Sequence, residues 1–246
     1  KARRLVGTTY FFTTVSVTAT ESPMMTATLA SGVTVLKNCA LEPEIVELAA
    51  YLNRQGAKIS GAGTPTITIR GVKRLRAGKF VTMPDRIETG TFAILAAAAK
   101  APLLITRCRP DHIEALLALF SKLGIVYETG ADWLRIVSVP KVLPSVDLKT
   151  HEYPGFATDL QSPFTVLMTQ ATGTSLIHET IYDRRLLFTD LLVQMGANIT
   201  LCDPHRALVQ GPTKLRGHKL TSPDLRAGIS MIIAGIIAKG TTTIDN

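Results

Sequence analysis

The sequence predicts an α/β fold assembled from a repeated unit, and three observations support this prediction. A strand, a turn, an amphipathic helix and a further strand recur in the same order in residues 32–60, 101–129 and 173–200. Each of these copies ends its helix at a glycine: Gly56, Gly124 and Gly196. The segments between the copies carry a second type of helix that is almost wholly apolar, so other elements must surround it.

The amphipathic helix of each copy is predicted from the spacing of its apolar residues. In the first two copies they follow the helical pattern i, i+3, i+4, i+7: Ile45, Leu48, Ala49 and Leu52, then Ile113, Leu116, Leu117 and Phe120. A glycine placed after such a helix tolerates the left-handed backbone that commonly ends it. Short strands are expected to follow: 58–60, 66–70, a stretch around Thr200, and 207–210.

The apolar helices are predicted at 92–99, 164–168 and 229–238. Each full unit then holds an amphipathic outer helix, a buried inner helix and about four strands. The copies start about seventy residues apart, which is longer than the common solenoid repeats. We therefore expect buried helices ringed by sheets, with three units in each domain.

A domain boundary is expected at residues 82–85 (TMPD), because the following RIETGTF begins a new inner helix. Residues 1–84 are expected to form the C-terminal part of one domain, and residues 85–246 most of a second. The final GTTTIDN repeats the opening of a unit and stops where a helix should follow. We therefore expect the chain to be incomplete.

The composition is that of an ordinary globular protein, with 46% apolar and 19% charged residues over 246 positions. The longest apolar run, 229–238, is too short to cross a bilayer, so no membrane partner is expected. Three cysteines without paired spacing are predicted to be buried thiols of a cytoplasmic protein: Cys39, Cys108 and Cys202. No histidine spacing indicates a metal, and no cofactor is expected.

The formal net charge of +8 indicates anionic partners. A nucleic-acid-binding module is one alternative, but the basic residues are scattered and no aromatic platform accompanies them. The one dense cluster, in residues 73–79, is interpreted as the solvated face of a hairpin. Small phosphorylated substrates explain the charge equally well, and we expect no nucleic-acid partner.

Three aspartates occupy equivalent junctions, each just before an apolar helix: Asp85, Asp159 and Asp224. A carboxylate in this place commonly caps the helix by accepting its free backbone N–H groups. The alternative begins from YPGFATDLQ, in which turn-forming residues place Asp159 at the mouth of a helix. A carboxylate held there can act as a general base, beside helix N-termini that attract anions.

Two arginines are candidate site residues. Arg185 stands in a repeat position that isoleucine occupies in the other two copies, Ile45 and Ile113. Such an arginine either packs its stem while its guanidinium stays in water, or caps a strand, or belongs to the functional site. Arg226 follows Asp224 and Leu225 directly at the start of an apolar helix, and it is the better candidate for binding a phosphate.

Several motifs together strongly resemble the UDP-N-acetylglucosamine 1-carboxyvinyltransferase family: TVSVTATESPMMTATLASG, LEPEIVELAAYLNRQGAKISGAGT, MPDRIETGTF, YPGFATDLQSPFT, ETIYDRR and DLRAGIS. The resemblance runs through nearly the whole chain in the right order. It implies a fold of two inside-out α/β barrels built from repeated units. It also implies transfer of the enolpyruvyl group of phosphoenolpyruvate to the 3-hydroxyl of UDP-N-acetylglucosamine, the first committed step of peptidoglycan synthesis.

The resemblance also assigns roles to residues. It implies that Asp159 takes the proton of the sugar hydroxyl and contacts the sugar nucleotide, and that Arg226 lies on the phosphoenolpyruvate side. The segment Thr14, Val15, Ser16 and Val17 matches the part of the family that holds the UDP moiety. Ile181 matches another nucleotide contact, and Arg185 fits the family pattern with a less defined role. The partners that the resemblance implies are the substrates, UDP-N-acetylglucosamine and phosphoenolpyruvate, while the oligomeric state stays open. Cytosolic substrates imply a cytoplasmic protein.

The sequence departs from the family in places that matter. The family's catalytic loop, with its acid, and a lysine–asparagine pair would precede Lys1, and a further arginine would follow Asn246. None of the cysteines stands in a context like that loop, and Thr14 stands where many members carry a lysine. We therefore expect this stretch alone to be inactive.

Other functions stay open at this point. The sister carboxyvinyltransferase that acts on shikimate 3-phosphate shares the fold and the phosphoenolpyruvate chemistry, although YPGFATDLQ and EPEIVELA favour the sugar-nucleotide branch. A non-catalytic paralogue that binds the sugar nucleotide is a second alternative. A nucleic-acid module is the third, and it would bind DNA in a strongly salt-dependent manner.

Overall fold

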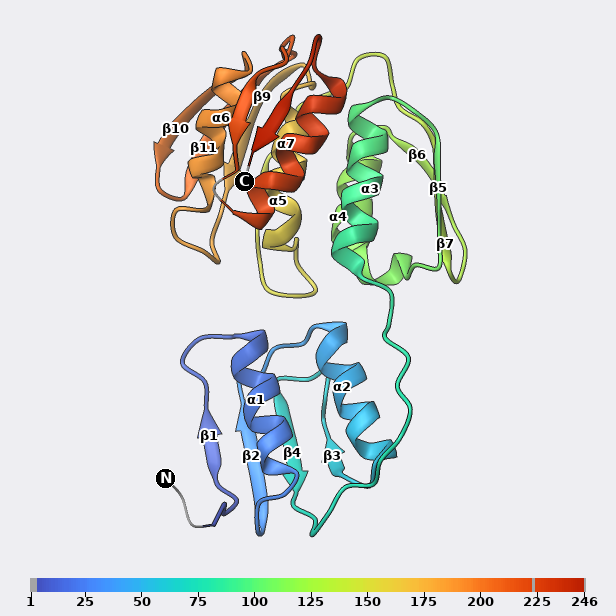
Figure 1. Ribbon diagram of the computed structural model, residues 1–246, viewed down its shortest axis with the longest axis vertical. Coiled ribbons are helices and arrows are strands. Elements are labelled where there is room, and N and C mark those ends of the chain that lie inside the picture. The colour runs from blue at the N-terminus through green and yellow to red at the C-terminus, as the bar shows by residue number, and fades with distance from the viewer. Residues whose placement is uncertain (1–3, 223, 246) are drawn as a thin grey trace. The chain divides into compact units, whose positions relative to one another are not determined.

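The computed structural model describes residues 4–222 and 224–245. The chain forms two compact units, shown in Figure 1. The N-terminal unit runs to Met83 and includes Glu152–Pro154, and the C-terminal unit takes Pro84–His151 and the residues from Gly155 onward. Each unit has its own hydrophobic core.

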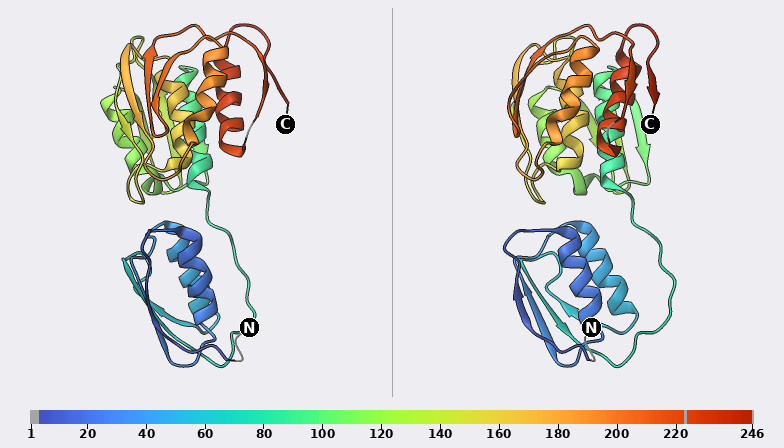
Figure 2. Two further views of the ribbon diagram at one scale, coloured as in Figure 1. Left: turned by 90° about the vertical axis from the view of Figure 1, so that its left-hand side faces the viewer. Right: turned by 60° about the vertical axis from the view of Figure 1, so that its left-hand side comes forward.

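The N-terminal unit is a four-stranded sheet with two helices on one face, as Figure 2 shows. Its elements are β1 (Thr9–Phe11), α1 (Val17–Ala27), β2 (Val33–Lys37), α2 (Pro43–Arg54), β3 (Lys58–Ser60) and β4 (Thr66–Arg70). The strand order is β1-β2-β4-β3, in which only the β1–β2 pair is parallel. The core between sheet and helices is formed by residues such as Met24, Leu36, Ile45 and Ile67.

Local signals explain where the helices of this unit begin and end. Ser16 precedes α1, and its hydroxyl accepts a hydrogen bond from the Ala19 N–H at 3.3 Å. Pro43 begins α2, where a missing N–H costs nothing. Gly56 follows α2 with φ of +100°, the left-handed conformation that glycine adopts without a steric penalty.

The C-terminal unit begins with an α3 (Arg86–Ala98) helix and a three-stranded sheet. This sheet has the order β5-β7-β6, and both of its strand pairs are antiparallel. The remaining elements of this first repeat of the C-terminal unit are β5 (Leu103–Thr106), the 3₁₀ turn η1 (Pro110–Ile113), α4 (Glu114–Lys122), β6 (Val126–Thr129) and β7 (Trp133–Ser138).

A second repeat builds a four-stranded sheet of order β10-β11-β9-β8. Its elements are β8 (Leu148–Lys149), η2 (Thr158–Leu160), α5 (Gln161–Met168), β9 (Gly173–His178), η3 (Arg185–Phe188), α6 (Thr189–Gln194), β10 (Asn198–Asp203) and β11 (Arg206–Gly211). A third repeat contributes the parallel pair of β12 (Lys219–Thr221) and β13 (Thr243–Asp245), joined by α7 (Leu225–Ile237).

The C-terminal unit places its helices inside and its sheets outside (Figure 2). Helices α3, α5 and α7 pack against one another at the centre. Every residue of α5 is buried, and Phe156 packs edge-to-face against Phe164 of this helix at 5.4 Å between ring centroids. Because α3, α5 and α7 pack against one another, the N-terminus of each of these helices has a fixed place relative to the other two.

The predicted α/β fold of repeated units is confirmed. Each amphipathic helix is present, and Gly56, Gly124 and Gly196 all have positive φ at its end. The apolar helices coincide with α3, α5 and α7. The assignment of residues 1–84 and 85–246 to parts of two barrel domains stays a prediction.

Two expectations are wrong. Residues 71–85, with the basic cluster, form no hairpin and instead follow an irregular path, because β4 already has β2 and β3 on its two edges. The basic side chains there are exposed, as expected of a solvated segment. Cys202 is exposed, whereas Cys39 and Cys108 are buried. Its strand, β10, is at the edge of its sheet, where side chains remain open to water.

The buried centre of the C-terminal unit makes one prediction about stability. The change Phe164→Ala should lower the free energy of unfolding by about 3–5 kcal/mol, because it leaves a cavity among packed helices. The matched control is Phe92→Ala on α3, a phenylalanine that is 45% exposed; its cost should be about 1 kcal/mol or less. Urea unfolding followed by fluorescence of Trp133, the single tryptophan, measures both. Equal losses for the two variants would contradict the inside-out arrangement.

Candidate active site

Asp159 is the centre of a charge cluster in the C-terminal unit. It lies in η2, the short turn that leads into α5. Arg185 Nη1 donates to its Oδ1 at 2.9 Å, and Arg226 Nη2 donates to its Oδ2 at 2.7 Å. Both carboxylate oxygens are therefore engaged by guanidinium groups, and these three side chains together carry a net positive charge.

The fold brings these residues together from separate elements. Arg185 begins η3, directly after Arg184, which has a left-handed backbone with φ of +60°. Arg226 is the second residue of α7, and this helix packs against α5. The starts of α5 and α7 therefore lie side by side, each with the partial positive charge of a helix N-terminus.

Two of the three equivalent aspartates are helix caps. Asp85 Oδ1 accepts from the N–H groups of Ile87 at 2.7 Å and Glu88 at 3.1 Å. Asp224 Oδ1 accepts in the same way from Arg226 at 2.8 Å and Ala227 at 2.9 Å. The capping interpretation is confirmed for Asp85 and Asp224. By fixing the start of α7, Asp224 also fixes the backbone of Arg226.

Asp159 is not a cap, although the sequence gives it the same junction. The turn η2 precedes α5, so Asp159 lies inside the helical run rather than in front of it. The residues before η2 and α5, Ala157 and Leu160, make no side-chain cap. The carboxylate of Asp159 is thereby left free to face Arg185 and Arg226.

A polar layer supports Arg185. Its Nη1 also donates to Thr158 Oγ1 at 2.7 Å, and Thr158 in turn donates to Glu179 Oε2 at 2.9 Å. The guanidinium carbon lies 4.6 Å from the centroid of the Tyr182 ring, a distance at which a cation and an aromatic face attract each other. None of these three supporting residues was among the candidate site residues expected from the sequence. Glu179 and Tyr182 stand in the ETIYDRR motif that carried the resemblance, while nothing in the periodicity marks Thr158.

The remaining predicted site residues lie elsewhere. Ile181 belongs to the same unit as Asp159, and its backbone N–H donates to Glu179 Oε1 at 2.8 Å. Thr14, Val15, Ser16 and Val17 belong to the N-terminal unit, where the first three lie between β1 and α1 and Val17 is the first residue of α1. Thr14 is exposed and the other three are half-buried, with Ser16 engaged as the cap of α1.

Metal ligands and thiols can also form part of a site. Within residues 4–222 and 224–245, no group of three or more His, Cys, Asp or Glu side chains could hold a metal ion. Burial raises the pKa of the Cys39 and Cys108 thiols above their ordinary value, which lowers their reactivity at neutral pH. In the same described part of the chain, no helix is both long and apolar enough to span a membrane.

The arrangement suits the binding of an anion next to a base. The side chains of Arg185, Asp159 and Arg226 are 18%, 28% and 30% exposed, so a solute can reach all three. Guanidinium groups bind phosphate and carboxylate with two parallel hydrogen bonds. A carboxylate released from such partners can accept a proton from a hydroxyl within hydrogen-bond distance.

The family model described as EPSP synthase (3-phosphoshikimate 1-carboxyvinyltransferase) matches residues 1–246. A UDP-N-acetylglucosamine 1-carboxyvinyltransferase of Thermodesulfovibrio yellowstonii is 46% identical over 246 residues, which are 100% of this chain and 59% of that protein. UDP-N-acetylglucosamine 1-carboxyvinyltransferase 2 of Bacillus subtilis is 46% identical over 244 residues, 99% of this chain and 57% of that protein. The chain thus spans less than two thirds of the length of these relatives.

Two solved structures that match this chain cover 98% or more of its length. The enolpyruvyl transferase NikO from Streptomyces tendae superposes with a TM-score of 0.89 at 26% identity, covering 100% of this chain and 61% of that one. EPSP synthase from Acinetobacter baumannii superposes with a TM-score of 0.69 at 17% identity, covering 98% of this chain and 58% of that one. The second likeness shows the fold alone.

The double ion pair predicts how the cluster responds to a free anion. In Asp159→Asn the two guanidiniums lose their counter-charge, so inorganic phosphate should bind them more tightly than in the unaltered protein. Phosphate should then raise the thermal midpoint of the variant by about 2–4 °C for each kcal/mol of added binding. A thermal melt across a phosphate series measures this rise.

The control for this experiment is Asp85→Asn. Asparagine caps a helix about as well as aspartate, and the Asp85 carboxylate accepts hydrogen bonds from two backbone N–H groups. Its response to phosphate should equal that of the unaltered protein. An equal response from both variants would contradict the role of Asp159 as the counter-ion of Arg185 and Arg226.

Proposed function

The chain belongs to the EPSP synthase (3-phosphoshikimate 1-carboxyvinyltransferase) family, and from that premise we propose that it is part of a UDP-N-acetylglucosamine 1-carboxyvinyltransferase. The proposed reaction joins the enolpyruvyl group of phosphoenolpyruvate to the 3-hydroxyl of UDP-N-acetylglucosamine and releases phosphate. This reaction is the first committed step of peptidoglycan synthesis. The relatives that carry this name, at 46% identity over the whole chain, support the choice of acceptor.

The observation that carries the proposal is the carboxylate of Asp159 between two arginines. A sugar hydroxyl is a weak nucleophile, so a base must accept its proton while the new bond forms. The hydroxyl oxygen bonds to the carbon of phosphoenolpyruvate that bears the phosphate, while the methylene carbon takes a proton from the general acid that the resemblance implies. Loss of a proton from that methyl group then restores the double bond as the bond to the phosphate oxygen breaks and phosphate leaves. Asp159 is the base in this proposal.

Both oxygens of Asp159 are paired before a substrate binds. Arg185 and Arg226 each donate to a different oxygen, and each oxygen keeps a lone pair that can accept a further hydrogen bond from the sugar hydroxyl. Phosphoenolpyruvate brings a phosphate and a carboxylate, which are the anions that guanidinium groups prefer. We propose that Arg226 moves to the phosphate and that Arg185 stays nearer the sugar side of Asp159.

The sugar nucleotide contacts remain those that the resemblance implies. We propose that Thr14, Val15, Ser16 and Val17 contact the UDP moiety, and that Ile181 contacts the nucleotide in the segment that also carries Arg185. Asp85 and Asp224 support the starts of α3 and α7 in this proposal. Both units are parts of larger barrel domains, and the reaction takes place in the cytoplasm, where its substrates are made.

Phosphate release tests the proposal in the protein expressed from its complete reading frame. Phosphoenolpyruvate with UDP-N-acetylglucosamine should release phosphate, and Asp159→Asn should lower kcat by about 10²–10⁴-fold, the usual contribution of a general base. Asp85→Asn should keep kcat within about threefold because asparagine preserves the cap. A coupled colorimetric assay for phosphate measures both.

A parallel reaction replaces the sugar nucleotide with shikimate 3-phosphate, the acceptor in the family description. Phosphate release with shikimate 3-phosphate alone would assign the chain to the sister enzyme. Silence with both acceptors from a folded protein would instead indicate a paralogue that binds sugar nucleotides without turning them over. Full activity of Asp159→Asn would remove Asp159 from the role of base.

A further inference from the structure

We propose that Glu179, acting through Thr158, is a positioning residue that holds the guanidinium of Arg185 against Asp159. The proposal rests on the function proposed above for Asp159. Glu179 lies one residue beyond the end of β9, and its side chain is fully buried, with 0% exposure. Burial of a carboxylate is unfavourable unless donors surround it, so its presence here calls for a physical reason.

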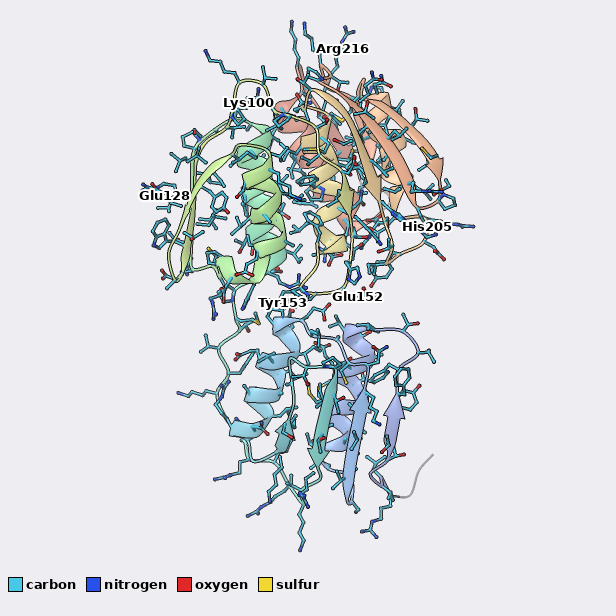
Figure 3. The ribbon with its side chains drawn as sticks, turned by 180° about the vertical axis from the view of Figure 1, so that it is seen from behind. Lys100, Glu128, Glu152, Tyr153, His205 and Arg216 are labelled. Carbon is cyan, nitrogen blue, oxygen red and sulfur yellow. The ribbon has the colours of Figure 1, made fainter. Side chains whose placement is uncertain are left out.

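Donors on three groups hold the Glu179 carboxylate. Oε1 accepts from the backbone N–H groups of Ile181 at 2.8 Å and Tyr182 at 3.1 Å, and Oε2 accepts from the Thr158 hydroxyl at 2.9 Å. The main chain of Glu179 is fixed as well, because its N–H donates at 2.8 Å to the carbonyl of His205, labelled in Figure 3. The carboxylate therefore has one defined orientation.

The chemistry of the donors gives the Thr158 hydroxyl one direction. An arginine can only donate, so the Thr158 oxygen accepts from Arg185 Nη1 at 2.7 Å. The single hydroxyl proton is then left for Glu179, and an ionised carboxylate can only accept. The chain of hydrogen bonds runs from Arg185 through Thr158 to Glu179. Each group donates to the next, so the direction of both bonds is fixed.

This chain determines how Arg185 meets Asp159. The two hydrogens of Nη1 are divided between Thr158 Oγ1 and Asp159 Oδ1, so the hydroxyl sets the rotation of the guanidinium plane. The ring of Tyr182 faces the same guanidinium, and Glu179 holds the backbone N–H of Tyr182. Glu179 thus fixes both supports of Arg185, and it keeps Arg185 in place when an anion draws Arg226 from Asp159.

The substitutions that test this proposal differ by few atoms. Thr158→Val keeps the volume of the side chain and removes the hydroxyl, and Thr158→Ser keeps the hydroxyl. Glu179→Gln keeps an oxygen for the two backbone N–H groups but presents an NH₂ to Thr158, which reverses the polarity of that bond. Thr158 is only half-buried, so its variants remain informative if the change at Glu179 impairs folding.

The experiment measures kcat and KM for both substrates, and the thermal midpoint, in the protein from the complete reading frame. Thr158→Val and Glu179→Gln should each lower kcat about 10- to 100-fold, the loss expected for one hydrogen bond to a charged group. KM for UDP-N-acetylglucosamine should change less than threefold, and Thr158→Ser should restore kcat to within about threefold. The double variant should be no slower than the slower single variant, because both changes break the same chain of bonds.

Several results would overturn the positioning role. These are kcat within twofold of the unaltered protein for both single variants, equal losses in Thr158→Ser and Thr158→Val, or multiplied losses in the double variant. A loss of kcat that follows the thermal midpoint alone would also overturn it, since that pattern indicates a structural role.

A crystal structure of Thr158→Val separates this proposal from the proposed function. The distance from Arg185 Nη1 to Asp159 Oδ1, 2.9 Å here, should lengthen beyond 3.5 Å or the guanidinium should turn. An unchanged pair would overturn the positioning role even in an active enzyme. If the pair is displaced in Thr158→Val but the unaltered protein releases no phosphate, the positioning role is supported and the proposed function is rejected.

Discussion

The contact between one carboxylate and two guanidiniums, Asp159 with Arg185 and Arg226, is the interaction on which the candidate site of the C-terminal unit depends. Its members come from the turn before α5, the turn after β9 and the start of α7. They meet because the inner helices pack side by side and present their starts together. The repeat therefore does more than build a core: within the C-terminal unit, it places the equivalent N-termini of helices from neighbouring repeats around one point. Asp159 neutralises only part of the positive charge at that point, so the remaining positive charge favours the binding of an anion.

The same constraint explains why equivalent aspartates have different roles. Asp85 and Asp224 stand before their helices and satisfy free N–H groups. The turn η2 moves Asp159 past that position, and its carboxylate then needs another partner. One repeat has thus exchanged a capping bond for a pair of ion pairs. Behind them, the buried Glu179 sets the direction of the supporting hydrogen bonds, so the flexible Arg185 side chain has one arrangement rather than several.

Much of the fold could be predicted from the sequence, because apolar spacing and terminal glycines repeat at fixed places. The glycine after α2, α4 and α6 takes positive φ in each copy. The site was less predictable: the three aspartates occupy the same kind of junction, the YPGFATDLQ motif and the resemblance singled out Asp159, and the position of η2 gives the structural difference. Thr158 and Glu179 meet across 21 positions of the chain, and no local pattern encodes such a bond. The expected hairpin after β4 is absent because the two edges of that strand are taken by β3, which directly precedes it in the chain, and by the more distant β2.

The most direct measurement is a crystal structure of the protein from its complete reading frame with UDP-N-acetylglucosamine and inorganic phosphate bound. We expect the Arg226 guanidinium to lie on the phosphate and Arg185 to keep its bond to Thr158. An Asp159 oxygen should then lie about 2.6–3.2 Å from the 3-hydroxyl of the sugar. Both ion pairs intact, with the phosphate and the sugar hydroxyl bound away from Asp159, would contradict this expectation.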